Sequence, residues 1–251
     1  MKLPVIAGVI DRRILVNYQV DPEVLARTLP APFRPMLVRG VGLAGICLIR
    51  LQGVRPRGLP AWLGITSENA AHRTAVEWDD AGETHEGVFV RRRDTDSRLN
   101  TLAGGRIFPG VHHHGQFDVL ESDEQLHVAF HSDDDAVRVS VDARPSDRVP
   151  ATSVFRSLAE ASAFFQAGSV GYSVTQDERC FQGLELRCPV WHTTPLDTAA
   201  VRSSYFADET IFPRGSVRYD SAFLMRDVQH QWHARPDLVA RRAPLVFAGA
   251  T

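Results

Sequence analysis

Residues 111–143, VHHHGQFDVLESDEQLHVAFHSDDDAVRVSVDA, decide the fold class. Apolar and polar side chains alternate in LHVAF (126–130) and in VRVSV (137–141), which places the apolar ones on one face of a strand. The turn-forming runs SDE (122–124) and DDD (133–135) separate these two strands from each other and from the strand before them. The pattern predicts an antiparallel meander of three strands.

Outside this meander the chain predicts further strands and a few short helices. Strands are expected at residues 14–20, 41–54, 65–78, 86–92, 172–174, 184–189 and 217–232, with a hairpin turn at residues 79–82. Helices are expected after the Asp21-Pro22 cap, across residues 96–104, and from the capping box at Ser157–Glu160 to Ala167. We therefore predict a single mainly β domain over residues 1–251, a β-rich α+β fold with a closed or nearly closed antiparallel sheet and three or four short peripheral helices.

Composition excludes several classes of partner. The apolar content of 44% supplies a sizeable core, and the net charge of −2 gives no basic excess for nucleic acid or an anionic membrane. No stretch approaches the roughly 18 apolar residues of a membrane span. The three cysteines are scattered and form no disulfide framework, so we expect a cytoplasmic protein. A homo-oligomer is compatible with the sequence.

Arginine replaces lysine almost everywhere in this chain. Of the 28 basic residues, Lys2 is the only lysine. Arginine stays protonated and cannot act as an amine nucleophile. The composition therefore excludes an enzyme that forms a Schiff base on an internal lysine.

The histidine run at 112–114 is the first candidate site. On a strand, His113 is in phase with the apolar Phe117, so we expect it to point inward, whereas His112 and His114 are expected to point outward. Three interpretations remain open. The outward pair could bind zinc together with a carboxylate, the run could be a solvated polar face, or His113 could be an acid/base group in the interior.

A second candidate site combines Glu68, Arg73 and Arg106. Glu68 and Arg73 stand five residues apart on one predicted strand, which places them on opposite faces unless a bulge intervenes. Arg106 follows two glycines at the entry to the histidine strand, where it could hold a carboxylate through two hydrogen bonds. A surface ion pair or a structural arginine is the alternative. The run Arg91–Arg93 is interpreted as a solvated strand end.

Four segments together resemble a known family. NYQVDPEVLARTLP (17–30), VGLAGICLIRLQGVRPRGLP (41–60), SENAAHRTAV (67–76) and GVFVRRRDTDSRLNTLAGGRIF (87–108) resemble, in this order, the YqjF-like family of uncharacterised bacterial proteins, domain of unknown function 2071. That family is grouped with the acetoacetate decarboxylase-like superfamily. The resemblance is good over residues 14–120 and extends to the rest only in layout.

The resemblance implies a curved antiparallel sheet closed into a cone or barrel. Its interior pocket takes small oxo-acids or related carboxylates in the members with known chemistry. Glu68 and Arg73 match the family's Glu and Arg, and Arg106 matches the arginine before the catalytic strand. Where the decarboxylases carry a lysine pair, this chain has Val111, His112 and His113.

This departure limits the chemistry that the resemblance implies. Decarboxylase members form an iminium that takes up the electrons released with carbon dioxide, and histidine cannot form one. We therefore expect a small oxo-acid or carboxylate as partner, and lysine-independent acid/base chemistry of a hydratase, dehydratase, isomerase, aldol-type lyase or cyclase. Glu68, His113 and Arg106 are the predicted catalytic residues, and Arg73, His112 and His114 are predicted to bind the substrate, with no cofactor or metal.

Two alternatives to this function remain open. The first is a non-catalytic barrel that binds a small ligand, which an apolar pocket with one arginine and no proton-exchanging pair would favour. The second is a metal-dependent enzyme, which needs three ligands that converge on one point.

Overall fold

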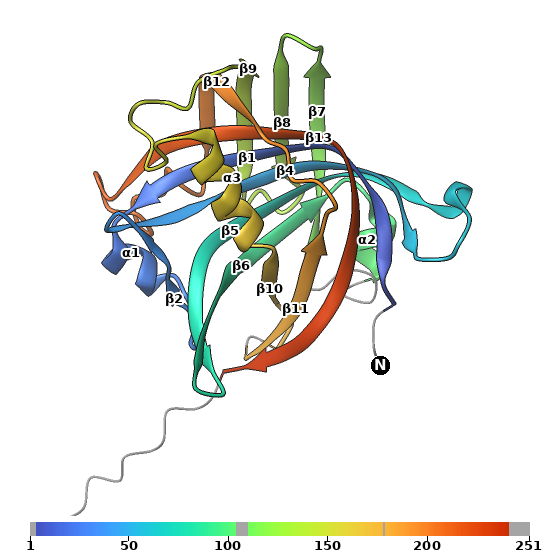
Figure 1. Cartoon of the computed structure of the whole chain (residues 1–251), viewed down its shortest axis with the longest axis horizontal. Helices are drawn as coiled ribbons and strands as arrows, with labels where there is room; N and C mark the ends of the chain where they lie inside the picture. Colours follow the sequence, from blue (N-terminus) through green and yellow to red (C-terminus); the bar gives the residue numbers. More distant parts are fainter. Residues whose placement is uncertain (1–3, 104–109, 178, 241–251) are drawn as a thin grey trace, which may run out of the picture.

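The computed structural model describes residues 4–103, 110–177 and 179–240, in which strands outnumber helices (Figure 1). The strands are β1 (Ile6–Val20), β2 (Arg34–Pro35), β3 (Leu37–Val38), β4 (Val41–Pro56), β5 (Ile65–Asp80), β6 (Glu83–Thr95), β7 (His112–Glu121), β8 (Leu126–Ser132), β9 (Arg138–Pro145), β10 (Val170–Val174), β11 (Cys180–Arg187), β12 (Thr194–Ser203) and β13 (Val217–Val239). The helices are α1 (Pro22–Arg27), α2 (Arg98–Ala103) and α3 (Leu158–Ala167), with a 3₁₀ turn at Ala61–Leu63.

The sheet closes on itself twice. Strands β1, β4, β5, β6, β10, β11 and β13 pair in that order, and the pairing of β11 with β13 closes what we call the small ring. A second series of pairings runs from β6 through β7, β8, β9 and β12 to β13, and together with the strands between β13 and β6 it forms what we call the large ring. The predicted fold, a curved β sheet closed into a barrel with a few short helices, is therefore confirmed. The sheet is mixed, because β7 and β10 both pair with β6 in parallel.

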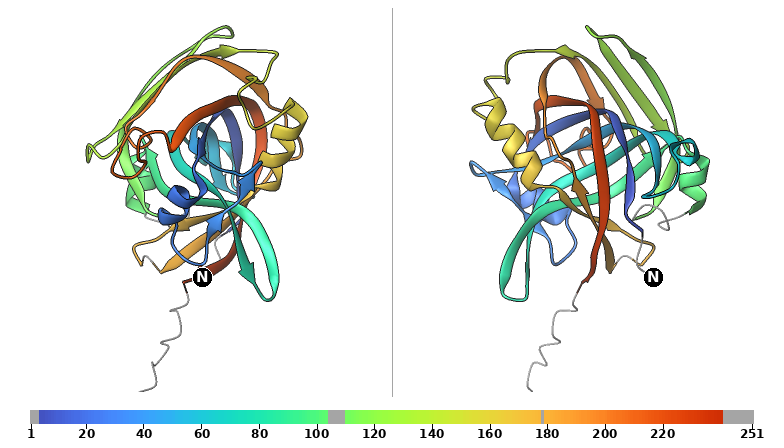
Figure 2. Two further views of the ribbon diagram at one scale, coloured as in Figure 1. Left: turned by 90° about the vertical axis from the view of Figure 1, so that its left-hand side faces the viewer. Right: turned by 45° about the vertical axis from the view of Figure 1, so that its right-hand side comes forward.

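Strands β1, β4 and β5 belong to both rings, and we call them the shared wall. In Figure 1, β7, β8 and β9 lie above this wall and β10 and β11 below it, while Figure 2 shows the long, bent β13 along its side. Each ring encloses its own apolar cluster, with Ile46 and Leu48 in the large ring and Cys47 in the small one. Burial on both faces explains why residues 41–54 are apolar without alternation.

The predicted meander and helix caps are present. Strands β7, β8 and β9 pair antiparallel in sequence order. Asp21 Oδ1 accepts hydrogen bonds from the first turn of α1, and Ser157 Oγ accepts one from Glu160 N at 3.2 Å. The Glu160 carboxylate accepts from Arg156 N, one residue before the position that a capping box predicts. Gly104, the last residue of the helix predicted across residues 96–104, lies outside the described residues.

Strand β12 was not predicted, and β13 is longer than predicted. The segment TPLDTAAVRS (194–203) begins next to a proline and lacks a clear alternation. Its strand conformation depends on pairing with β9 on one side and β13 on the other. Such long-range pairing overrides local propensity, which is weak for strands in any case.

A buried carboxylate joins the loop before α3 to the small ring. Asp220 is fully buried and accepts four hydrogen bonds, two from the backbone or amide groups of Val154 and Gln19 and two from the hydroxyls of Ser153 and Ser221. Each donor has exchanged water for this carboxylate on folding. The carboxylate therefore anchors residues 153–154 to β1 and β13.

We expect Asp220→Ala to lower the free energy of unfolding by about 3 kcal/mol or more, because it leaves several buried donors unsatisfied. Urea unfolding at pH 7 measures this change. The matched control is Asp197→Ala, since Asp197 is exposed and pairs with the exposed Arg144, and its loss should cost about 0.5 kcal/mol or less. Equal losses in the two variants would contradict the anchoring role.

A buried histidine makes stability depend on pH. His72 lies on the large-ring face of the shared wall beside Tyr205, and neither ring nitrogen has a hydrogen-bond partner among the described residues. Burial, and then the charge of Arg92, lower the pKa of His72 to about 3. Below pH 6.5 the unfolded chain takes up a proton that the folded protein refuses, so stability falls as the pH falls from 6.5 towards 3.

We expect His72→Leu to weaken this dependence. Between pH 7 and pH 5 the variant should lose less unfolding free energy than the wild type, by up to about 2 kcal/mol. Urea titrations at the two pH values measure the difference. His131→Leu, at an exposed position, should leave the pH dependence as it is in the wild type. An unchanged pH dependence in His72→Leu would refute the assignment.

Candidate functional site

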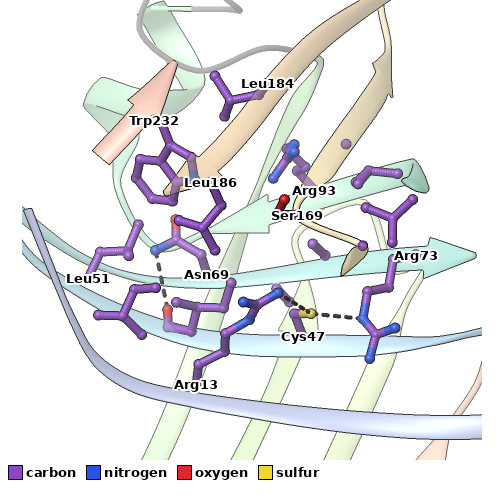
Figure 3. Close-up of a pocket in the computed structure, with 18 of the residues that line it drawn as sticks. Arg13, Cys47, Leu51, Asn69, Arg73, Arg93, Ser169, Leu184, Leu186 and Trp232 are labelled. Carbon is purple, nitrogen blue, oxygen red and sulfur yellow. Dashed lines mark hydrogen bonds between the residues drawn. The ribbon is translucent and has the colours of Figure 1, made fainter. Parts of the chain in front are cut away.

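The small ring encloses a cavity of about 110 Å³ (Figure 3). A single water needs roughly 10–15 Å³ of such space, so a small organic acid fits. Its apolar lining comes from Ile10, Ile49, Leu51, Val88, Val90, Leu184, Leu186, Trp191 and Trp232. Its polar lining includes Arg13, Cys47, Asn69, Arg73, Arg93, Asp94, His112 and Ser169.

Three arginines from three strands of the wall and its edge reach this cavity. Arg13 comes from β1, Arg73 from β5 and Arg93 from β6. Within the described part of the chain, none of the three forms an ion pair with a carboxylate. Arg73 donates to Asn17 Oδ1 at 2.6 Å and Arg93 to Ser173 Oγ at 2.9 Å, and neither of these acceptors carries a charge.

Cys47 lies between two of these guanidinium groups. Its Sγ accepts from Arg73 Nε at 3.0 Å and from Arg13 Nη2 at 3.7 Å, and in Figure 3 the two side chains approach the sulfur from opposite sides. Burial raises the pKa of this thiol, but the charges of Arg73 and Arg13 and their hydrogen bonds outweigh burial. The net effect is a pKa below the ordinary value, which favours the thiolate.

Arg93 and His112 are neighbours on adjacent strands, where β6 and β7 run parallel. Burial lowers the pKa of Arg93 to about 10, partly offset by the nearby Cys47, so this guanidinium keeps its charge at neutral pH. Burial, and then the charge of Arg93, lower the pKa of His112 to about 3. His112 is therefore a neutral imidazole beside a cation.

The unsatisfied polar atoms of the cavity are hydrogen-bond donors. Arg13 Nε and Nη1 and the indole nitrogen of Trp191 are buried without a partner among the described residues. Among the described lining residues Asp94 is the one with a carboxylate, and Arg92 already binds both of its oxygens. A ligand that fits here must therefore supply acceptor atoms.

The structure brings some of the predicted site residues together. Arg73 and His112 both line the cavity. Glu68 does not line it, because it lies on the other face of β5, five residues from Arg73, as the odd spacing predicts. There its carboxylate binds Arg12 and Arg50. Arg106 lies outside the described residues.

The predicted outward orientation of His112 is wrong, because this side chain lines the cavity. The register of β7 against β6 sets His112 beside Arg93 and His113 beside Asp94, on the other face. His113 does share a face with Phe117, but that face belongs to the large ring, where His113 Nδ1 lies 3.2 Å from Asp134 Oδ2. His114 instead contacts Asp133, with 2.7 Å between Nδ1 and Oδ2. Among the described residues no three His, Cys, Asp or Glu side chains converge as a metal site.

Three cavity residues were missed from the sequence: Arg13, Cys47 and Arg93. The sequence gives only a weak sign that two of them belong to a site. Arg13 lies inside the apolar stretch IDRRILV (10–16), where an arginine is unusual because charged residues are rare in buried strands, and Cys47 lies within ICLI (46–49). Arg93 was attributed to a solvated strand end. An extra residue at Arg91 in the pairing of β6 with β5 instead turns Arg93 into the small ring.

No helix in the described ranges is long and apolar enough to cross a membrane.

Several solved structures have a similar fold. Acetoacetate decarboxylase from Legionella pneumophila subsp. pneumophila str. Philadelphia 1 is 12% identical with a TM-score of 0.59, over 94% of this chain and 88% of that chain. An acetoacetate decarboxylase-like enzyme from Sphingomonas wittichii RW1 is 11% identical with a TM-score of 0.60, over 97% and 95%. The enduracididine biosynthesis enzyme MppR complexed with pyruvate is 12% identical with a TM-score of 0.54, over 96% and 91%.

At these identities the likeness establishes the fold alone. Among the curated proteins, none matches this chain. Residues 10–224 match the DUF2071 family, whose description is uncharacterized conserved protein. Because this match covers most of the sequence, the chain belongs to the DUF2071 family, and it has the fold of acetoacetate decarboxylase-like proteins.

Proposed function

We propose that this protein binds a small oxo-acid or related carboxylate in the small-ring cavity and acts on it without a Schiff base. The observation that carries the proposal is the set of three cavity arginines, none of which has a carboxylate partner among the described residues. A buried cation without a counter-charge is costly, and a bound anion removes much of that cost.

The chemistry of the lining favours a carboxylate among the possible anions. A guanidinium donates charge-assisted hydrogen bonds that suit carboxylate oxygens, and Arg13 has two nitrogens, Nε and Nη1, that are buried without a partner among the described residues. The apolar walls suit the carbon part of a small acid. The structural neighbour MppR, which is complexed with pyruvate, supports the same class of ligand.

Catalysis in this cavity would depend on charge stabilisation and proton transfer. A guanidinium can polarise the carbonyl of an oxo-acid and stabilise the enolate that forms when a neighbouring proton leaves. Glu68 and His113, the predicted proton-transfer residues, lie outside the cavity, so this role falls to the cavity groups Cys47 and His112. Such a set suits enolisation, hydration or dehydration, aldol-type cleavage, or cyclisation.

We expect Arg13→Gln and Arg93→Gln each to weaken pyruvate binding about ten- to a hundred-fold, the value of one or two hydrogen bonds to a charged group. Calorimetric titration measures the affinity. Arg144→Gln removes the same charge from the exposed surface of β9 and should bind like the wild type. Equal affinities in all four proteins would exclude the cavity as the binding site.

We also expect the protein to catalyse exchange of the methyl protons of pyruvate with D₂O, because enolisation is the step that the cavity charges favour. Proton NMR follows the loss of the methyl signal. Lys2→Arg should exchange at the wild-type rate, since no Schiff base is involved. Tight binding without exchange would instead support a non-catalytic binding barrel, and loss of exchange in Lys2→Arg would contradict the lysine-independent chemistry.

A further inference from the structure

We propose that Cys47 is a nucleophile that captures the oxo-acid by reversible addition to its carbonyl carbon. This inference rests on the proposed function, since it takes the same cavity and the same class of ligand. It assigns a covalent role to a residue on β4 that faces the cavity between two guanidinium groups.

The sulfur is held in place by a chain of hydrogen bonds. Arg73 is 5% exposed and uses Nη2 to bind Asn17 Oδ1, which leaves Nε directed at Cys47 Sγ. Asn17 is itself fixed, because its amide donates to the backbone oxygens of Leu15 and Ser221. The geometry around the thiol is therefore set by the shared wall and does not depend on a mobile side chain.

The surroundings of Cys47 favour its thiolate, in contrast to the other two cysteines. The charges of Arg73 and Arg13 bring the pKa of Cys47 below its ordinary value in spite of burial. Burial raises the pKa of Cys180, and the nearby Asp237 and Asp177 add to this effect. Burial also raises the pKa of Cys188. The thiolate is the nucleophilic form, so the surroundings of Cys47 favour the ionisation state that addition needs.

Unpartnered donors next to the sulfur provide a place for the ligand's carboxylate. Arg13 donates to Cys47 Sγ through Nη2, while its Nε and Nη1 are buried and have no partner among the described residues. The indole N–H of Trp191, whose ring lies 5.6 Å from the Arg13 guanidinium carbon, has none either. A 2-oxo acid that binds Arg13 through its carboxylate carries its carbonyl carbon one bond away, which brings this carbon towards the sulfur.

The addition step balances without any further reactant. A bond forms between Sγ and the carbonyl carbon, and the π electron pair of the carbonyl moves to its oxygen. That oxygen then takes the proton that the thiol released on ionisation. The product is a hemithioketal, the sum of one thiol and one carbonyl compound. The arginines that line the cavity stabilise the oxyanion that precedes protonation.

The test compares two alkylating probes at the three cysteines of the native protein. Iodoacetate is a small carboxylate with an electrophilic carbon, and iodoacetamide is its neutral counterpart. We expect Cys47 to react about ten-fold or more faster with iodoacetate, because a site lined by one sign of charge concentrates the opposite charge by 10–10³. Mass spectrometry of the digested protein measures the rate at each cysteine. Cys180, beside two aspartates, should show no such preference.

Arg13→Gln is the matched variant, and it should lose the preference for iodoacetate at Cys47 while its unfolding midpoint shows that it folds. In the wild type, the alkylation rate at Cys47 should also rise with pH, and the midpoint of this rise should lie at a lower pH than for an ordinary thiol. If Cys47 reacts no faster with iodoacetate than with iodoacetamide, or no faster than Cys180, the proposal is overturned.

A second measurement separates this proposal from the proposed function. With pyruvate labelled with ¹³C at its carbonyl, the NMR signal should move from the ketone region to that of a tetrahedral carbon in the wild type and not in Cys47→Ser. If pyruvate binds both proteins by calorimetry and the signal stays in the ketone region, the covalent role fails and carboxylate binding stands. If pyruvate binds neither protein while Cys47 keeps its preference for iodoacetate, the proposed ligand class fails and the reactive thiolate stands.

Discussion

Burial of the shared wall on both faces is the constraint on which the rest of this structure depends. Strands β1, β4 and β5 close two rings at once, so side chains that alternate along them enter two different interiors. In the middle of this wall, where both faces are buried, a polar residue cannot turn to water. Each one must find a partner across the ring, form part of a binding site, or lower the stability of the fold.

Adjacent residues on the two faces meet this constraint in opposite ways. Arg12 faces the large ring, where Glu68 and Glu121 neutralise it, whereas Arg13 faces the small ring and has no carboxylate partner among the described residues. Arg92 and Arg93 repeat the contrast, since Arg92 binds two aspartates and Arg93 binds a serine hydroxyl. The large ring supplies counter-charges from its own side chains. Among the described residues, the small ring has no carboxylate paired with its three cavity arginines, and this contrast supports the proposed binding of an anion there.

The sequence predicts this architecture where local rules apply. Alternation in residues 126–141 identified the meander, and the caps at Asp21 and Ser157 located two helices correctly, because these signals need only neighbours in sequence. The closure of the rings depends on pairings such as β11 with β13, which no local pattern encodes. In a wall with two apolar faces, the phase of His113 with Phe117 identifies a shared face, but it does not say which ring that face belongs to.

The permanence of arginine charge gives the cavity its chemical character. A lysine in such a site can lose its proton and become a neutral amine, but a guanidinium stays charged. Asp94 is paired with Arg92, so the remaining charged side chains of the described lining are the three arginines, and the thiol of Cys47 can neutralise at most one of them. In the proposed reaction the oxo-acid carries one negative charge, and its enolate carries two. Because buried guanidinium groups stabilise a negative charge that develops on the ligand, the proposed site would favour the enolate over the acid that binds first, and stronger binding of the species nearer the transition state is the condition for catalysis.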